Sequence, residues 1–160
     1  MRLVNINFLC EWMLIIFTIG FTKKSAEKFF EALRSSGAKH LLDIRLNNKS
    51  QLAGFTKRND LSYFLKHLAN IEYHEIPMLA PDESILKDYR KSGDWARYEQ
   101  RYLELIQHRH AEKSISSAIF KEGFILLCSE SEPNHCHRRL AAEYLVRAIP
   151  TNAKPDIIHL

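Results

Sequence analysis

Apolar runs and amphipathic stripes alternate along the chain. Met13 to Thr18 is a run of large and β-branched residues, which predicts a strand covered on both faces. Ser25 to Ser35 predicts an amphipathic helix, because apolar residues recur at i, i+3, i+4 and i+7. These residues are Ala26, Phe29, Phe30 and Leu33, and Gly37 follows where a C-terminal cap is expected. His40 to Ile44 predicts the next strand.

The middle of the chain repeats this order. A polar loop, Leu46 to Lys57, leads into a second helix with Asn59 as its candidate cap. Its apolar positions are Leu61, Phe64, Leu65 and Leu68. The segment Ile71 to Ile76 alternates apolar and polar residues and stops at Pro77, which favours a strand at the edge of a sheet.

The last part of the chain contains the most apolar short run. Trp95 to His110 predicts a helix with the stripe Trp95, Tyr98, Tyr102, Leu105 and Ile106. A shorter helix ends at Gly123, and Phe124 to Cys128 then predicts a central strand. The final helix runs from near His135 to Ala148, and Ile157 to His159 predicts a small last strand.

This alternation of strands and helices is typical of βαβ units around a mostly parallel sheet. Because 160 residues suit one core, we expect a single three-layer α/β domain over residues 13–160, Rossmann-like, with helices flanking the sheet. Residues 1–12 are expected to be an N-terminal appendage. The apolar stretch Phe8 to Ile19 is interrupted by Glu11 and falls short of the roughly 20 residues of a membrane span, so no membrane partner is expected.

Composition narrows the class of protein. Hydrophobic residues make up 46% and charged residues 26%, as in ordinary globular domains, and the net charge of +4 allows nucleic acid without requiring it. Three cysteines, a small odd number, indicate free thiols, and we expect a cytoplasmic protein. Gly20 stands alone, so the glycine-rich loops of nucleotide cofactors are absent and no cofactor is expected.

Polar residues gather at the predicted carboxyl ends of the strands, where ligands bind in open parallel sheets. The residues at these ends are Thr18, Gly20, Asp43, Arg45, Cys128 and Glu130. The densest segment continues to Arg138, and we expect Pro133 in the first turn of the last helix with Glu132 or Asn134 as its cap. Unpaired N–H groups in that turn favour an anion or a thiolate.

These positions define a hypothesis for the site. Arg45 and Arg138 would hold a phosphate or carboxylate, with Thr18, Gly20 and Cys128 as further ligand-binding residues. Asp43 or Glu130 would act as the general base, and Cys136 or His137 as nucleophile or proton carrier. We expect a small anionic ligand, a nucleotide or a nucleic-acid end as the partner.

Structural alternatives remain open. Cys136 begins an i, i+4, i+8 stripe with Leu140 and Tyr144 and is equally explained as core, and Cys128 alone is better explained by packing. Asp43 and Arg45 are alternatively a local ion pair. The whole motif would then belong to a non-catalytic nucleic-acid or protein interaction module. Zinc bound by the two cysteines with His135 or His137 and Glu130, or a disulfide under oxidation, are minority alternatives.

The chain resembles the family of the domain of unknown function 488 from about Phe17 to Val146. The resemblance is carried by Thr18-Ile-Gly20, Asp43-Ile-Arg45 with Ser50, Leu61 with Leu65, Tyr73, Pro77-Met-Leu79, Tyr98, and Cys128-Ser-Glu130 through Cys136-His137-Arg138. It implies a compact α/β domain and no established activity. Asn48 stands where the family pattern has proline, and Ala80 where it has glycine.

Overall fold

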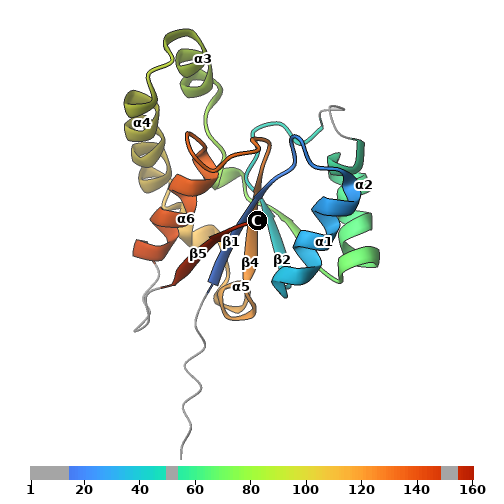
Figure 1. The fold of residues 1–160 in the computed structure, drawn as a ribbon. Helices are drawn as coiled ribbons and strands as arrows, with labels where there is room; N and C mark the ends of the chain where they lie inside the picture. The colour runs from blue at the N-terminus through green and yellow to red at the C-terminus, as the bar shows by residue number, and fades with distance from the viewer. Residues whose placement is uncertain (1–14, 50–53, 149–154) are drawn as a thin grey trace, which may run out of the picture.

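The computed structural model describes residues 15–49, 54–148 and 155–160, and within them the strands form one all-parallel sheet (Figure 1). The strands are β1 (Ile15–Gly20), β2 (His40–Asp43), β3 (Glu72–Glu75), β4 (Phe124–Cys128) and β5 (Asp156–His159). They lie in the order β3-β2-β4-β1-β5, so the predicted α/β class with a parallel sheet is confirmed. The predictions about residues 1–12 and Ser50 fall outside the described residues.

Helices α1 and α2 connect the first three strands of the chain. Helix α1 (Ala26–Ser36) begins where the Ser25 side chain accepts a hydrogen bond from the N–H of Lys28, and it ends at Gly37 with φ 72°. Helix α2 (Arg58–Phe64) continues into a π turn, η2 (Leu65–Ala69). The expectation of a cap at Asn59 is wrong, because this residue lies inside the first turn of α2.

The π turn also changes which side chains face the core. Leu61 and Leu65 are fully buried, as their spacing predicts, but Leu68 is 53% exposed. A π turn holds more residues than an α turn, so the apolar stripe loses its register after Leu65. Asn70, with φ 54°, then ends the helical segment.

The second half of the chain contributes α3 (Glu83–Ser92), α4 (Trp95–His108), α5 (Ser117–Glu122) and α6 (His137–Ala148). Short 3-10 turns are η1 (Gly54–Thr56), η3 (Pro77–Leu79) and η4 (Ala111–Ser114). The sequence analysis did not predict α3, although its inward residues have helical spacing: Ile85 is buried, and Leu86 and Tyr89 pack against the core.

The domain has three layers, and an apolar core lies on each face of the central sheet. On one face of the sheet, Phe29, Phe30 and Leu33 of α1 pack with Leu61 and Leu65 against the strands. On the other face, the core is made by α4, α5 and α6, including Tyr98, Tyr102, Ile106, Ile119, Leu140 and Leu145. Figure 1 shows α1 and α2 on one side of the strands and α4 and α6 on the other.

The sheet has a topological switch point between β1 and β4. The chain leaves β1 for α1 on one face and leaves the neighbouring β4 for α6 on the opposite face. In open parallel sheets this reversal opens a crevice at the carboxyl ends of the two strands. Gly20 and Cys128 are paired in register there. No helix in the described part of the chain is long and apolar enough to cross a membrane.

Candidate functional site

Gly20, the last residue of β1, lies against the loop that follows β4. A Cβ atom on this residue would be 1.6 Å from the carbonyl oxygen of Glu130 and 2.9 Å from a guanidinium nitrogen of Arg138. The next turn is tied to the same loop, since the N–H of Thr22 donates to the carbonyl of Ser129 at 3.1 Å. Glycine is therefore required here for the close approach of two backbone segments.

Two buried thiols and a buried guanidinium group lie at the carboxyl ends of β1 and β4. The Sγ atoms of Cys128 and Cys136 are 3.1 Å apart, and both residues are free cysteines. Arg138, 1% exposed, donates from Nη1 to the Cys128 sulfur at 2.9 Å and lies 3.6 Å from that of Cys136. It also donates to the carbonyl oxygens of Glu130 (2.6 Å) and Ser131 (3.1 Å).

The charge of Arg138 has an unusual environment. Its hydrogen bonds reach sulfur and carbonyl oxygen, and no carboxylate of the described residues pairs with it. Its Nε is a buried nitrogen that has no hydrogen-bond partner within the described part of the chain. A buried cation is costly unless an anion compensates it, so the nearby sulfur atoms are its available counter-charge.

The two thiols differ in how readily they ionise. The pKa of Cys136 lies well below its usual range, because Cys128 donates a hydrogen bond to its sulfur and His137 adds a further hydrogen bond and positive charge. The N–H of Arg138 also stabilises the thiolate. Burial and the neighbouring Cys136 raise the pKa of Cys128 far above its usual value. The contacts therefore favour ionisation of Cys136 over ionisation of Cys128.

Cys136 occupies the position immediately before α6, where its carbonyl accepts from the N–H of Arg139 at 3.2 Å. The helix begins at His137, two residues later than expected, so Pro133 precedes the helix and lies outside its first turn. The expected cap at Glu132 or Asn134 is wrong for the same reason. The thiol of Cys136 itself sits where a capping side chain would.

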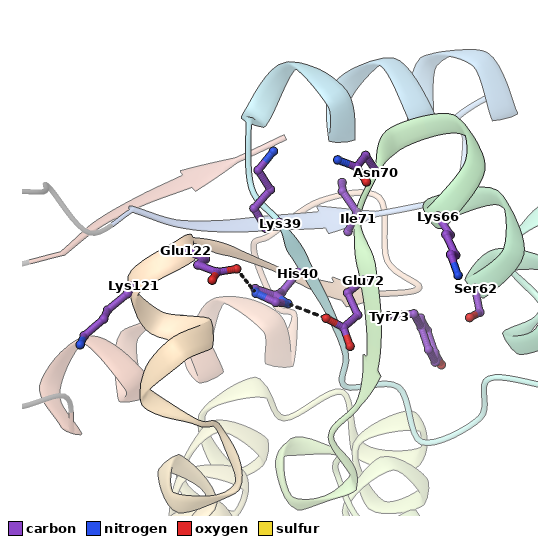
Figure 2. Close-up of a pocket in the computed structure, with 10 residues that line it drawn as sticks. All are labelled: Lys39, His40, Ser62, Lys66, Asn70, Ile71, Glu72, Tyr73, Lys121 and Glu122. Carbon is purple, nitrogen blue, oxygen red and sulfur yellow. Dashed lines mark hydrogen bonds and ion pairs between the residues drawn. The ribbon is translucent and has the colours of Figure 1, made fainter.

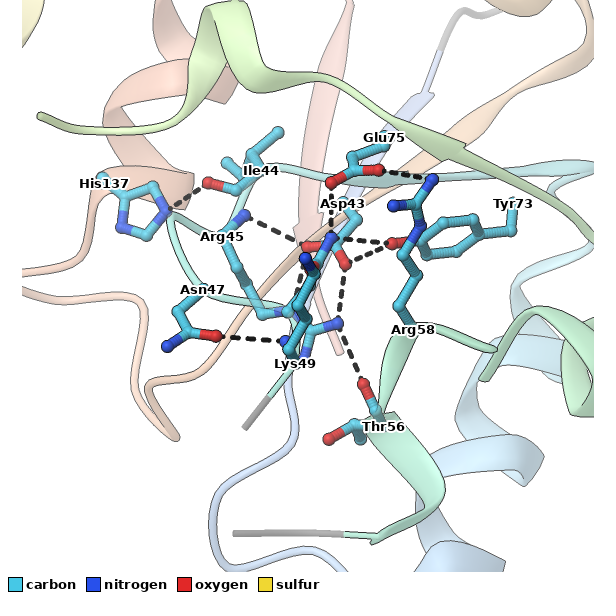
Figure 3. A network of polar contacts seen from close by, with 11 residues as sticks. Asp43, Ile44, Arg45, Asn47, Lys49, Thr56, Arg58, Tyr73, Glu75 and His137 are labelled. Carbon is cyan, nitrogen blue, oxygen red and sulfur yellow. Dashed lines mark hydrogen bonds and ion pairs between the residues drawn. The ribbon is translucent and has the colours of Figure 1, made fainter. Parts of the chain in front are cut away.

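Asp43 and Arg45 belong to a second buried network, which Figure 3 shows. Arg45 and Asp43 make a two-pronged ion pair, Nε to Oδ1 at 2.8 Å and Nη2 to Oδ2 at 2.6 Å, with side chains 4% and 0% exposed. Tyr73 donates its hydroxyl to Asp43 Oδ2 at 2.7 Å, and Arg45 also donates to the carbonyl of Thr56 at 2.9 Å. The guanidinium group lies 5.5 Å from the ring centre of Phe21.

The positive charge of Arg45 in this network is balanced by the negative charge of Asp43. Burial alone would lower the pKa of Arg45, but the hydrogen bond and charge of Asp43 outweigh it and the pKa is raised. Burial, followed by the charge of Asp43, raises the pKa of Tyr73, so the phenol stays a donor. Asp43 thus accepts from Tyr73 and from both the side chain and the N–H of Arg45.

Asn48 anchors the loop that follows this ion pair. Its amide nitrogen donates to Glu75 at 2.6 Å and approaches the hydroxyl of Tyr73 at 3.4 Å. Glu75 is in turn paired with Arg58 at 3.0 Å. A proline at this position would have no side-chain donor, so asparagine adds a polar contact between the loop and β3.

The structure brings most of the predicted residues to one edge, in two touching clusters. His137 Nε2 lies 3.1 Å from the carbonyl oxygen of Ile44, which joins them. Thr18 is not at the rim, since it is fully buried in β1 with its hydroxyl 2.6 Å from Nδ1 of His159. The backbone of Glu130 takes part, but its side chain is exposed.

The two thiols of the zinc alternative are adjacent, but among the described residues no histidine or carboxylate completes a cluster of three ligands with them. The ring of His137 is turned to the backbone of Ile44, and the ring of His135 lies 5.0 Å from that of Trp95. Among the described residues, the cluster of three potential metal ligands is elsewhere, at His40, Glu72 and His74. The sequence analysis missed this cluster. The i, i+2 pair Glu72 and His74 on a predicted strand was the available signal.

The family assignment rests on a long match. The profile of the domain of unknown function DUF488 matches residues 25–145. The chain belongs to this family. The DUF488 match includes the Asp43–Arg45 network and the whole Cys128 to Arg138 segment, while β1 and β5 lie outside it. No curated protein and no solved structure matches the chain.

Proposed function

We propose that the carboxyl edge of this DUF488 domain is a thiol-dependent catalytic site for a phosphate-bearing or otherwise anionic ligand, such as a nucleotide or a nucleic-acid end. The observation that carries the proposal is the buried guanidinium group of Arg138, which faces the two sulfur atoms and lacks a carboxylate partner among the described residues. Its Nε is a buried donor without a partner in the described part of the chain, and we assign this donor to a ligand anion. A buried polar group without a partner is rare enough to need an explanation.

The roles follow from the contacts. Cys136 is the nucleophile, because its neighbours stabilise the thiolate, and Cys128 holds the proton beside it. His137, which is half-buried, is the proton carrier, and the exposed carboxylate of Glu130 is the base. Asp43 is enclosed by Arg45 and Tyr73, so we assign it a positioning role.

Three further residues of the hypothesis keep supporting roles in the proposal. Arg45 fixes the loop between β2 and β3, and Gly20 allows the loop after β4 to lie directly against the end of β1. Thr18 supports β1 through His159. A pair of free thiols persists in a reducing compartment, which supports a cytoplasmic location.

One observation favours a second candidate, a non-catalytic interaction module. Arg45 is paired within the chain, Arg138 already has carbonyl and sulfur partners, and both thiols are buried. In this case the motif stabilises the loop after β4. The crevice then binds nothing, and a nucleic acid or protein partner is contacted elsewhere on the surface.

Thermal shift separates the two candidates. Unfolding temperatures are measured with inorganic phosphate, mononucleotides and short oligonucleotides for the wild type, Arg138→Lys and Cys136→Ser, with the exposed Arg90→Ala as the matched control. If the site is catalytic, a ligand raises the unfolding temperature of the wild type and of Arg90→Ala by the same amount. It raises the unfolding temperature of Arg138→Lys by less. The bound ligand also protects Cys136 from alkylation. No shift with any ligand in the panel contradicts the anion site and favours the module.

A further inference from the structure

A second cluster of polar side chains lies at the opposite, amino edge of the sheet. His40 and Glu72 are the first residues of β2 and β3 and are paired in register, and His74 follows Glu72 at i+2. Residues at i and i+2 of a strand point to the same face. The sheet therefore brings two imidazoles and one carboxylate together from two neighbouring strands.

The ligand atoms of these three residues are closely spaced. His40 Nδ1 lies 3.0 Å from His74 Nε2 and 3.7 Å from an oxygen of Glu72, and that oxygen is 3.9 Å from His74 Nε2. In a tetrahedral zinc site with bonds of roughly 2.0–2.1 Å, neighbouring ligand atoms are about 3.3 Å apart. The observed triangle needs shifts of only a few tenths of an ångström to match.

A fourth residue orients the cluster. The other ring nitrogen of His40, Nε2, lies 3.0 Å from a carboxylate oxygen of Glu122 in α5. Figure 2 shows Glu122 and Glu72 on the two sides of the His40 ring. A carboxylate that accepts the second N–H of a histidine is the usual outer partner of a metal-binding imidazole, because it fixes the tautomer and the ring orientation. Nδ1 of His40 is thereby left with its lone pair toward His74 and Glu72.

We propose that His40, Glu72 and His74 bind one divalent transition-metal ion, with zinc the best match to two imidazoles and a carboxylate, and that Glu122 orients His40. Three protein ligands leave one coordination position for water or a ligand. A pocket of about 950 Å³ adjoins the site, lined by His40 and Glu72 and by Lys39, Lys66 and Lys121. The three lysines suit an anionic ligand of the metal. This site is separate from the thiol pair and does not depend on it.

The contrasting explanation is a hydrogen-bonded cluster that closes the edge of the sheet. One ring nitrogen then donates to the other, and a proton occupies the position of the metal. The two explanations differ in a measurable way. A metal site shows saturable binding of one ion that depends on all three ligands. A proton-bridged cluster binds zinc no more tightly than an ordinary surface histidine does.

The test uses the full chain, freed of any histidine tag and treated with a chelator. Zn²⁺ is titrated by calorimetry, and Co²⁺ is followed by its visible absorption, which reports tetrahedral coordination. The variants are His74→Ala, Glu72→Gln and Glu122→Gln, with the exposed His108→Ala as the matched control. Cys128→Ser/Cys136→Ser removes the two adjacent buried thiols, which are a competing place for the metal. Glu72→Gln keeps the shape of a 70% exposed side chain, so a loss of binding in this variant does not come from misfolding.

The wild type, His108→Ala and the double cysteine variant are expected to bind one ion with equal affinity. Glu122→Gln is expected to bind about tenfold more weakly, at the lower end of the range for outer partners, and Glu72→Gln and His74→Ala more weakly still, by about 100-fold or more. Wild-type binding no tighter than that of His74→Ala overturns the proposal. The proposal is also overturned if the double cysteine variant loses metal binding and the wild type shows a sulfur-to-cobalt charge-transfer band.

Discussion

His137 Nε2 lies 3.1 Å from the carbonyl oxygen of Ile44, and this contact joins two motifs that are 93 residues apart in the sequence. Ile44 separates the two members of the Asp43–Arg45 ion pair, and His137 separates the thiol of Cys136 from the guanidinium group of Arg138. The ion pair and the thiols are therefore connected to each other through one backbone carbonyl.

The ionisation of Cys136 gives a pH-dependent prediction. Its pKa is lowered to about 4 from a usual 9.0, first by the hydrogen bond from Cys128. Because the folded chain favours the thiolate, this group stabilises the fold fully above the usual thiol pKa, and the contribution is lost as the pH falls toward 4. Ultraviolet absorbance should detect one thiolate at neutral pH in the wild type and none at this site in Cys136→Ser.

Variants of Cys128 test the cause of that shift. Cys128→Ala removes the hydrogen-bond donor and is expected to raise the pKa of Cys136 toward the ordinary thiol value. Cys128→Ser keeps a hydroxyl donor and is expected to raise it less. A wild-type titration at the ordinary thiol pH would contradict the assignment.

The short distance between the two sulfur atoms gives a second prediction. Cys128 and Cys136 are 3.1 Å apart at Sγ, and a disulfide needs about 2.05 Å. Diamide is expected to oxidise them to one intramolecular disulfide, seen as a loss of two hydrogens by mass spectrometry. Formation of intermolecular dimers through Cys128 or Cys136 would disagree with this geometry.

Gly20→Ala tests the close approach at the end of β1. The new Cβ would meet the carbonyl oxygen of Glu130 at 1.6 Å, and backbone on both sides must move. We expect a loss of about 3 kcal/mol or more in the free energy of unfolding, measured by urea denaturation. Gly54→Ala is the control, because nothing lies within 4 Å of its added Cβ, and its effect should stay within about 1 kcal/mol. Equal effects of the two substitutions would rule out the contact.

The ion pair of β2 predicts a large loss of stability on Asp43→Asn. This change leaves the guanidinium group of Arg45 buried without its negative partner, and breaking a buried pair from one side typically costs about 3–5 kcal/mol. The exposed pair Glu83–Lys87, at 2.9 Å, supplies the control. Glu83→Gln should leave the urea midpoint nearly unchanged, because water already screens this pair. A small effect of Asp43→Asn would mean that water reaches Arg45.

Much of the fold follows from local periodicity. The limits of β4 are those predicted, because Phe124 to Cys128 is a short apolar run between a glycine and a polar loop. The edge position of β3 was predicted from its alternation and from Pro77. The helix α3 was missed although Ile85, Leu86 and Tyr89 carry its spacing, since a solvent-facing helix has a weak apolar signal.

The site was predictable in its location more than in its contacts. Cys128, Cys136 and Arg138 lie in one segment after the central strand, so their proximity follows from the topology. The direction of Arg138 toward the carbonyls of Glu130 and Ser131 depends on the path of the loop past Gly20, which local sequence does not encode. The contact between His40 and His74 likewise depends on strand register.

The internal partners of Arg138 have a consequence for affinity. A ligand anion that uses this guanidinium group must compete with the Glu130 and Ser131 carbonyls, which accept hydrogen bonds from it. The apparent dissociation constant is then the intrinsic value divided by the fraction of molecules in which the arginine is released. If Arg138 is released in one molecule out of a hundred, the protein binds the ligand about a hundredfold more weakly than the contacts alone would give. Substitutions that loosen the 129–131 turn would therefore increase occupancy without adding a single contact to the ligand.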